Sequence, residues 1–300
     1  MTQSFPEFVT LMEVGPRDGL QNQSQYVSVE QKLALIGRSI EAGVKRIQVT
    51  SFVHPRLVPQ MADAEAVCAG LPALAREDVL FNGLVLNLRG LERAHAAGLN
   101  YIDTGVPASE ALSQKNANST IEEGMRRMTD ILDRARVYGM RVRMGVQTAF
   151  GCVYEGAIPQ ARVVKLCERF LAMGIDELTI ADSAGLANPR QVKHLLNEII
   201  PMAGNTPVVL HLHDTRGMGI ANLYAALECG VRYFDSAFGG LGGCPFIKGA
   251  KGNIATEDSI NMLHAMGVET GIDIKQVSAI SRDLEQLFGQ ALPAKMHRFV

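Results

Sequence analysis

The chain has 300 residues, of which 47% are hydrophobic and 20% are charged, a composition typical of a globular protein with a sizeable buried core. A formal net charge of −2 provides no basic field for nucleic acid or an anionic membrane, so neither is an expected partner. No apolar run approaches the roughly 20 residues that span a bilayer, and the five cysteines are dispersed without CxxC spacing, which together predict a cytoplasmic protein without a disulfide framework.

Short β-branched or apolar runs alternate with longer segments that carry apolar residues at i, i+3 and i+4 along the whole chain. The runs predicted as strands are Val9–Val14, Arg46–Thr50, Val79–Leu84, Tyr101–Thr104, Arg141–Thr148, Glu177–Ala181, Pro207–His213 and Tyr233–Ala237. The clearest predicted helices are Glu30–Ala42, Thr120–Tyr138, Gln160–Met173 and Pro189–Ile200. Several helices are followed by a glycine just before the next strand, which suits the positive φ of a helix C′ position.

This alternation predicts an α/β fold, a single (β/α)8 TIM barrel over residues 1–300, because no linker-like change in composition divides the chain. The alternative is an open doubly wound sheet. That fold would carry a GxGxxG motif after the first strand, and Gly15–Gly19 is not one. A tail from about Thr270 to Gln290 predicts additional C-terminal helices packed on the barrel.

Reactive residues of a TIM barrel lie at the carboxyl ends of its strands. The first predicted strand is followed at once by Arg17 and Asp18, between Gly15 and Gly19. The alternative for this pair is an ordinary surface ion pair in a turn.

The seventh predicted strand ends with His211 and His213, which point to one face because residues i and i+2 of a strand do so. Two imidazoles at this place predict a metal site, and Asp18 would supply an anionic oxygen, since only the eighth strand separates strands one and seven. This ligand set suits Mg²⁺ or Mn²⁺, with Zn²⁺ as an alternative.

A glycine-rich segment follows the eighth predicted strand, with Cys244 at its centre and Lys248, Lys251 and Asn253 beyond. A thiol above the barrel mouth is suited to proton transfer if nearby charge tunes its pKa. The Asn253 amide oxygen is a further candidate metal ligand, and the lysines are candidates for binding phosphates. The alternatives are an incidental cysteine in a phosphate-binding loop and lysines that are merely solvated.

Other strand ends also carry polar residues. Ser51 follows the second predicted strand, Thr148 ends the fifth, and Asp182 follows the sixth. A carboxylate at a strand end is a suitable partner for a catalytic residue or a metal-bound water.

These motifs together resemble the hydroxymethylglutaryl-CoA lyase family, in order and over nearly the whole chain. The matching segments are Gly15–Asn22, Thr50–Val53, Val58–Met61, His211–Thr215, Gly239–Pro245 and Gly249–Asp258. The Gly-Gly-Leu-Gly-Gly-Cys-Pro stretch is much more particular to this family than the Arg-Asp-Gly and His-x-His elements, which related aldolases and Claisen-type synthases share.

The resemblance implies an acyl-CoA substrate, a homodimer and a divalent metal held by Asp18, His211, His213 and Asn253. It implies that Arg17 polarises the thioester carbonyl and stabilises an enolate. It also implies that Cys244 takes part in proton transfer, with Asp182 and His211 in support. Within this interpretation, the residues expected to contact substrate are Arg17, Gln21, Gln48, Ser51, Thr148, Lys248 and Lys251.

One departure from the family pattern concerns the second strand, where Gln48 replaces a glutamate of the motif Ile-Glu-x-Thr-Ser-Phe. Loss of a charge at a polar site alters specificity more than a small apolar change does. The substrate would then be hydroxymethylglutaryl-CoA or an analogue, such as citramalyl-CoA or a longer 3-hydroxy-3-alkylglutaryl-CoA. The remaining alternatives are a condensing synthase, which usually has extra regulatory domains, and a non-catalytic protein that binds acyl-CoA or metal.

Overall fold

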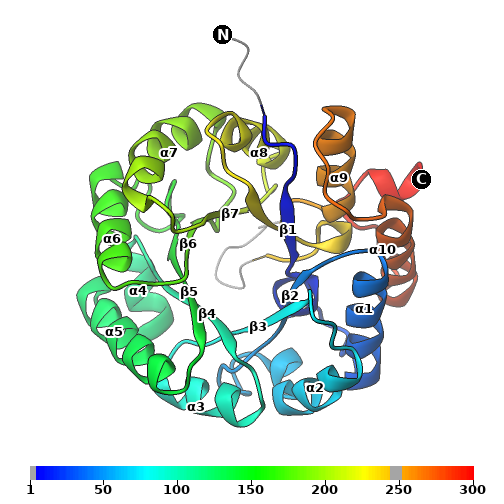
Figure 1. The fold of residues 1–300 in the computed structure, drawn as a ribbon, viewed down its shortest axis with the longest axis horizontal. Coiled ribbons are helices and arrows are strands. Elements are labelled where there is room, and N and C mark those ends of the chain that lie inside the picture. The colour runs from blue at the N-terminus through cyan, green and yellow to red at the C-terminus, as the bar shows by residue number, and fades with distance from the viewer. Residues whose placement is uncertain (1–4, 244–251) are drawn as a thin grey trace.

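The computed structural model describes residues 5–243 and 252–300, and Figure 1 looks down a ring of strands enclosed by helices. The strands are β1 (Thr10–Glu13), β2 (Arg46–Ser51), β3 (Leu80–Leu84), β4 (Tyr101–Pro107), β5 (Arg141–Gln147), β6 (Glu177–Asp182), β7 (Val208–Leu212) and β8 (Tyr233–Ser236). They form a closed barrel in chain order, with every neighbouring pair parallel and β8 paired with β1. The predicted TIM barrel is confirmed, and closure excludes the open doubly wound sheet.

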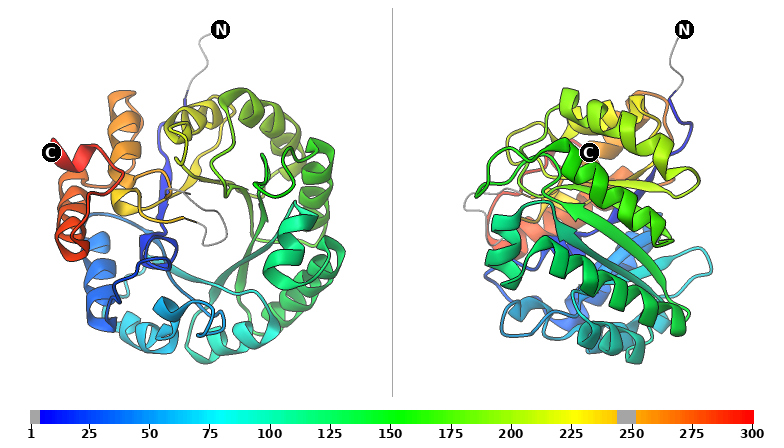
Figure 2. Two further views of the ribbon diagram at one scale, coloured as in Figure 1. Left: turned by 180° about the vertical axis from the view of Figure 1, so that it is seen from behind. Right: turned by 90° about the vertical axis from the view of Figure 1, so that its left-hand side faces the viewer.

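Helices lie outside the strands, as the two further views of Figure 2 show. They are α1 (Val29–Glu41), α2 (Ala64–Gly70), α3 (Leu88–Ala96), α4 (Glu110–Ala117), α5 (Ile121–Val137), α6 (Gln160–Ala172), α7 (Pro189–Ala203), α8 (Gly219–Glu228), α9 (Thr256–Ala265) and α10 (Ile274–Phe288). The four helices predicted from periodicity are α1, α5, α6 and α7. Ser28, Thr120 and Asn188 begin three of them with a capping box, in which side chains satisfy backbone N–H groups of the first turn.

The carboxyl end of β4 extends beyond its predicted limit at Thr104, because its last residues continue the ladder with β5. Gly105 pairs with Gly145, and Pro107 pairs with Gln147. The predicted strand ended at Thr104, and the glycine that follows weakens an isolated strand. Pairing with a neighbouring strand overrides that local preference.

The predicted C-terminal extension is α10 followed by a 3₁₀ turn, Met296–Arg298. Figure 1 places α10 beside α1 on the outside of the barrel. Asp258 of α9 fixes the segment after α10, since its carboxylate accepts hydrogen bonds from the backbone N–H groups of Lys295 and Met296.

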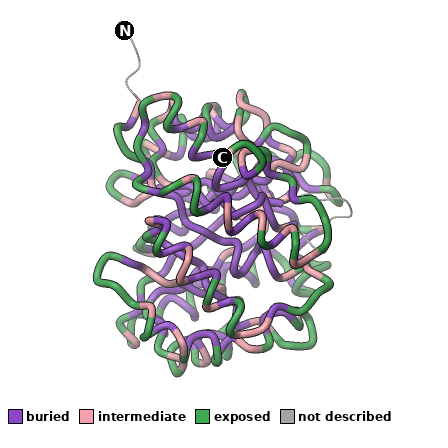
Figure 3. The backbone as a smooth tube through the Cα atoms, turned by 90° about the vertical axis from the view of Figure 1, so that its right-hand side faces the viewer, coloured by how far each residue is buried: buried purple, intermediate pink, exposed green. Residues whose placement is uncertain are grey.

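Buried residues follow the strands and the inner faces of the helices, whereas exposed residues gather in the loops and on the outer faces (Figure 3). Among the residues that the structure describes, no helix has both the length and the hydropathy to cross a membrane. The carboxyl ends of the strands, where the polar residues singled out in the sequence lie, form one end of the barrel.

Candidate active site

The turn after β1 is one π-helical turn, Gly15–Gly19, and all of its residues are buried. Arg17 Nη1 lies 2.6 Å from Asp18 Oδ1, and the two side chains are 10% and 7% exposed. The pair is therefore an ion pair, but not the surface pair considered as an alternative. Because burying two charges has a large desolvation cost, this placement indicates a functional demand rather than a gain in stability.

Glu13, at the end of β1, holds this turn against the segment after β8. Its Oε1 accepts hydrogen bonds from the backbone N–H of Gly15 (2.7 Å) and of Phe238 (3.0 Å), and its Oε2 accepts one from Thr256 Oγ1 (2.7 Å). Burial raises the pKa of Glu13 to about 8. A carboxyl group inside the protein thus joins the two segments that carry the most motif residues.

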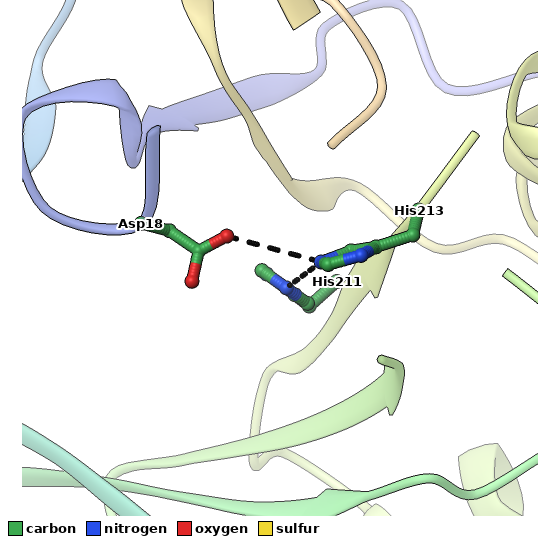
Figure 4. Close-up of side chains that lie close together, drawn as sticks. All are labelled: Asp18, His211 and His213. Atoms are coloured by element: carbon green, nitrogen blue, oxygen red, sulfur yellow. Dashed lines mark hydrogen bonds and ion pairs between the residues drawn. The ribbon is translucent and has the colours of Figure 1, made fainter. Parts of the chain in front are cut away.

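His211 and His213 face Asp18 across the barrel mouth (Figure 4). The two Nε2 atoms are 3.0 Å apart, and His213 Nε2 lies 3.8 Å from Asp18 Oδ2. One candidate ligand atom from each residue lies within 4.8 Å of the others. The sequence predicted this convergence, since β8 alone separates β7 from β1.

The protonation of both histidines suits a cation. His211 Nδ1 lies 3.0 Å from Asp235 Oδ2, and a proton on Nδ1 leaves the Nε2 lone pair free to face the cluster. Burial, together with the neighbouring His211, lowers the pKa of His213 to about 4. His213 is therefore neutral at pH 7, as a metal ligand must be.

Asn253 completes the cluster from the far side of the Gly-rich segment. Its Nδ2 donates to Asp18 Oδ2 (2.7 Å) and to the Leu241 carbonyl oxygen (3.0 Å). Its amide oxygen is buried and has no hydrogen-bond partner in the described part of the chain. Two ligand atoms at right angles around an ion with bonds of roughly 2.1 Å lie about 3 Å apart, the separation of the two histidine nitrogens. An orphaned oxygen and this spacing fit a divalent cation.

Hydrogen bonds and ion pairs run from this cluster around the barrel interior and return to it. We call this run of contacts the polar circuit; it leads from Asp18 through Arg17, Gln48, Asp103, Arg143 and Asp235 to His211, and the neutral His213 lies between its two ends. Arg17 Nε donates to Gln48 Oε1, and Gln48 Nε2 donates to Asp103 Oδ2 (2.7 Å). Arg143 then bridges Asp103 (2.6 Å) and Asp235 (2.7 Å) through Nη2.

The charges of the circuit are matched along it. Burial opposes ionisation of Asp18, but Arg17, the two histidines and the Asn253 hydrogen bond together outweigh it and lower the pKa of that carboxyl. For Asp235, burial again opposes ionisation, and Arg143 holds the pKa well below its usual value. Gln48 presents its oxygen to a cation and its nitrogen to a carboxylate, so a neutral amide satisfies both neighbours at once.

A cavity of about 300 Å³ opens beside the cluster. Arg17, Asp18, His211 and His213 line it, as does Gln21, whose Nε2 donates to Asp18 Oδ1 (2.8 Å). A substrate in this cavity would meet the cluster and the guanidinium together.

Other predicted site residues lie around the cavity rather than in its wall. Ser51 is buried, and its hydroxyl has no partner among the described residues. Thr148 donates from Oγ1 to the Gln147 carbonyl oxygen (2.7 Å), and Gln147 lines the cavity instead. Both Asp182 oxygens accept backbone N–H groups, from Leu186 and Ala187, and thereby shape the loop after β6. Cys244, Lys248 and Lys251 lie outside the described residues.

Sequence reasoning missed several residues of this site: Glu13, Asp103, Arg143, Thr179 and Asp235. Thr179 lines the cavity, and its buried hydroxyl has no partner in the described structure. Ionisable residues in the middle of otherwise apolar strands were the available signal, because a buried charge needs a partner. The partners themselves come from distant strands and could not be read from spacing.

Comparison with known proteins agrees with this geometry. Residues 8–284 match the family model described as HMGL-like. The chain is 42% identical over 272 residues to the cytoplasmic 3-hydroxy-3-methylglutaryl-CoA lyase of Rattus norvegicus, covering 91% of this chain and 79% of that protein. It is 37% identical to hydroxymethylglutaryl-CoA lyase YngG of Bacillus subtilis, covering 97% of each.

Solved structures extend the likeness to three dimensions. The HMG-CoA lyase of Acinetobacter baumannii, in complex with coenzyme A and 3-methylmalate, has a TM-score of 0.94 at 37% identity and covers 100% of this chain and 97% of its own. The chain belongs to the HMGL-like family and is a carbon–carbon lyase of the hydroxymethylglutaryl-CoA lyase type.

Proposed function

We propose that this protein cleaves the C2–C3 bond of a 3-hydroxy-3-methylglutaryl-CoA-like thioester, giving acetyl-CoA and a keto acid. The C3 hydroxyl loses its proton, C3 becomes a carbonyl carbon, and the electron pair of the broken bond passes to C2 as an enolate. A proton delivered to C2 then gives acetyl-CoA, so atoms and charge balance. The coenzyme A in the related Acinetobacter baumannii structure supports a thioester substrate.

Asp18, His211, His213 and Asn253 would hold a divalent cation, with Mg²⁺ or Mn²⁺ as the proposed ion. Such a cation would supply Lewis acidity and so favour loss of the proton from the substrate hydroxyl. The polar circuit contributes rigidity, because Asp235 fixes the ring of His211 and Arg17 fixes the Asp18 carboxylate. Metal affinity would accordingly depend on residues that do not touch the ion.

Arg17 would stabilise the enolate, since its guanidinium lies at the cavity wall beside the cluster. A fixed cation near the oxygen on which negative charge develops favours the transition state over the ground state. Cys244 would deliver the proton to C2, as the resemblance implies, with Asp182 positioning the loop after β6. Contacts from Gln21, Ser51, Thr148, Lys248 and Lys251 to the substrate remain predictions.

The single observation that carries the proposal is the meeting of Arg17 with the Asp18–His211–His213 cluster at one cavity. The test is release of acetyl-CoA from hydroxymethylglutaryl-CoA and citramalyl-CoA with Mg²⁺ or Mn²⁺, followed by chromatography. Arg17→Gln should lower kcat by about 10²–10³, whereas Arg76→Gln, at an exposed position, should not. If the protein binds these acyl-CoA thioesters tightly but releases no acetyl-CoA, it is a non-catalytic acyl-CoA-binding protein.

We also propose a single-domain, cytoplasmic homodimer. Support for one domain comes from the packing of α10 on α1 of the same barrel, and the related Rattus norvegicus enzyme is named cytoplasmic. Light scattering coupled to size-exclusion chromatography measures the mass directly. A mass of one chain at micromolar concentration would contradict the dimer.

A further inference from the structure

The C-terminal tail, residues 290–300, lies beside α9 and α10 (Figure 1) and contacts the 3₁₀ turn Phe238–Gly240, where the Gly-rich segment begins. The backbone N–H of Ala294 donates to the Gly239 carbonyl oxygen (3.1 Å). A Cβ on Gly239 would lie 2.3 Å from Leu292 Cδ1, and its φ of 67° also favours glycine. The tail is therefore in direct contact with the segment that leads to the metal cluster.

Two buried carboxyl groups accept the backbone N–H groups of this turn. Glu13 accepts the N–H of Phe238 (3.0 Å). Both oxygens of Glu257, on α9, lie 3.1 Å from the backbone nitrogen of Gly239. Burial raises the pKa of Glu257 to about 7. Because an ionised carboxylate holds an N–H group about twice as strongly as a neutral carboxyl does, a cation beside Glu257 would tighten its contact with the turn.

His297, in the tail, is placed to supply that charge. Its side chain is fully buried, with Nδ1 3.6 Å from Glu257 Oε1 and Nε2 3.0 Å from Glu285 Oε1. Neither ring nitrogen has a hydrogen-bond partner of good geometry among the described residues. Attraction between charges, which requires the imidazolium form, would then link His297 to the two carboxylates. Arg282 of α10 fixes the tail here, since its Nη1 donates to the His297 carbonyl oxygen (2.8 Å).

The turn is also connected to Asn253, the amide of the metal cluster. Leu241 follows the turn directly, and its carbonyl oxygen accepts hydrogen bonds from Asn253 Nδ2 (3.0 Å) and from the Asn253 backbone N–H (3.3 Å). A Cβ on Gly242 would lie 2.4 Å from Asn253 Nδ2, so the backbone and the amide are closely packed. A shift of the turn would consequently displace the Asn253 side chain.

We propose that His297 is a positioning residue of the active site, which acts through Glu257 to fix the turn Phe238–Gly240 and thereby the amide of Asn253. The C-terminal tail is then part of the structure that holds the cation, although it lies outside the ring of strands. The inference rests on the proposed function, which makes Asn253 a metal ligand. The competing explanation is that His297 only fills space beside α9 and α10 and contributes to stability.

The test is the affinity for Mn²⁺, measured by electron paramagnetic resonance without substrate. His297→Ala should weaken Mn²⁺ binding by roughly 2- to 30-fold, the range typical of substitutions that act on a site without touching its ligand. His194→Ala, at an exposed position of α7, should leave the affinity unchanged. If His297→Ala lowers the free energy of unfolding but binds Mn²⁺ as tightly as the parent protein, the inference is wrong and the proposed function stands. A parent protein that binds no Mn²⁺ would overturn both.

A double-mutant cycle separates the charge of His297 from its packing. Glu257→Gln keeps an acceptor oxygen for Gly239 but cannot ionise, so it should weaken Mn²⁺ binding as His297→Ala does. The double variant should bind about as weakly as either single variant, because both substitutions remove the same interaction. Additive losses would mean that His297 acts independently of Glu257 and would overturn the inference. If His297→Ala does not fold, His297→Gln, a neutral side chain of similar size, provides the same comparison.

Discussion

At the scale of single residues, Asp235 shows how a side chain outside the metal cluster controls a ligand within it. Its carboxylate fixes His211 Nδ1 and is itself paired with Arg143. A partner of this kind sets the tautomer and orientation of a ligating imidazole.

Asp235→Asn should therefore weaken Mn²⁺ binding by about 10- to 100-fold, because an amide leaves the orientation of the His211 ring less defined. Free Mn²⁺, measured by electron paramagnetic resonance during a titration, reports this affinity without any substrate. Asp78→Asn, in an exposed ion pair with Lys45, serves as the control. Equal affinities for the two variants would show that Asp235 does not support a metal ligand.

Gln48 stands where the family resemblance predicts a glutamate, and its neutral amide satisfies both Arg17 and Asp103. In Gln48→Glu, the introduced carboxyl would be buried and would face Asp103, so its pKa should lie above that of an ordinary glutamate. The protonated form preserves both contacts. Ionisation would lose the hydrogen bond to Asp103 and place a negative charge beside Arg17.

We expect kcat of Gln48→Glu to fall by about tenfold as the pH rises through this added ionisation, because Arg17 then stabilises the enolate less well. Measurement of kcat from pH 6 to pH 9 tests for this decrease. Gln114→Glu, which adds the same charge on the exposed face of α4, should follow the parent protein. Superimposable profiles for Gln48→Glu and the parent would refute the explanation.

Prediction from sequence succeeded for residues whose chemistry is concentrated in a motif, such as the His211–Leu212–His213 pattern, because strand alternation alone brings two imidazoles together. It failed for Arg143 and Asp103. Their significance arises from each other and from Asp235, and these three residues come from different strands.

At the scale of elements, the junction between β1 and the segment after β8 depends on one buried carboxyl group. Glu13 accepts hydrogen bonds from both sides of this junction. Its pKa is raised to about 8 in the folded protein, so the folded state keeps a proton that the unfolded chain loses near pH 4.5. Linkage then requires that the contribution of Glu13 to stability decreases as the pH rises from about 4.5 to about 8.

Glu13→Gln should reduce this pH dependence, since an amide keeps an acceptor oxygen for the Gly15 and Phe238 N–H groups and never ionises. Urea unfolding at pH 5, 6, 7 and 8 measures the slope, to which Glu13 contributes at most about 1.4 kcal/mol per pH unit. Glu41→Gln at an exposed position should keep the slope of the parent. An unchanged slope in Glu13→Gln would contradict the raised pKa.

The elements themselves were largely predictable, because long periodic segments and capping residues mark α1, α5 and α7 locally. The glycines expected at helix ends, for example Gly43 and Gly98, do have positive φ. The extension of β4 was not predictable, since it depends on the register with β5. Short helices such as α2, with seven residues, carry too little periodicity to be recognised.

At the scale of the whole molecule, Arg143 joins β4, β5 and β8 through the barrel interior. Its side chain is 2% exposed and pairs with Asp103 and Asp235. Removal of one partner from a buried ion pair leaves an uncompensated charge, which typically costs about 3–5 kcal/mol.

Arg143→Met should therefore lower the free energy of unfolding by about that amount, as measured by urea denaturation. Lys45→Met, which breaks the exposed pair with Asp78, should change it by less than about 1 kcal/mol. Similar changes in the free energy of unfolding for the two variants would mean that the barrel interior tolerates the unpaired carboxylates.

The polar circuit begins and ends at the metal cluster, so each residue between Asp18 and His211 has two neighbours and cannot be exchanged without disturbing both. A substitution at one of its positions therefore depends on the residues at the neighbouring positions. The effects of two such substitutions on the free energy of unfolding should not be additive. Evolution, or an engineer, can thus change residues outside the circuit one at a time, whereas the circuit itself has to be inherited as a unit.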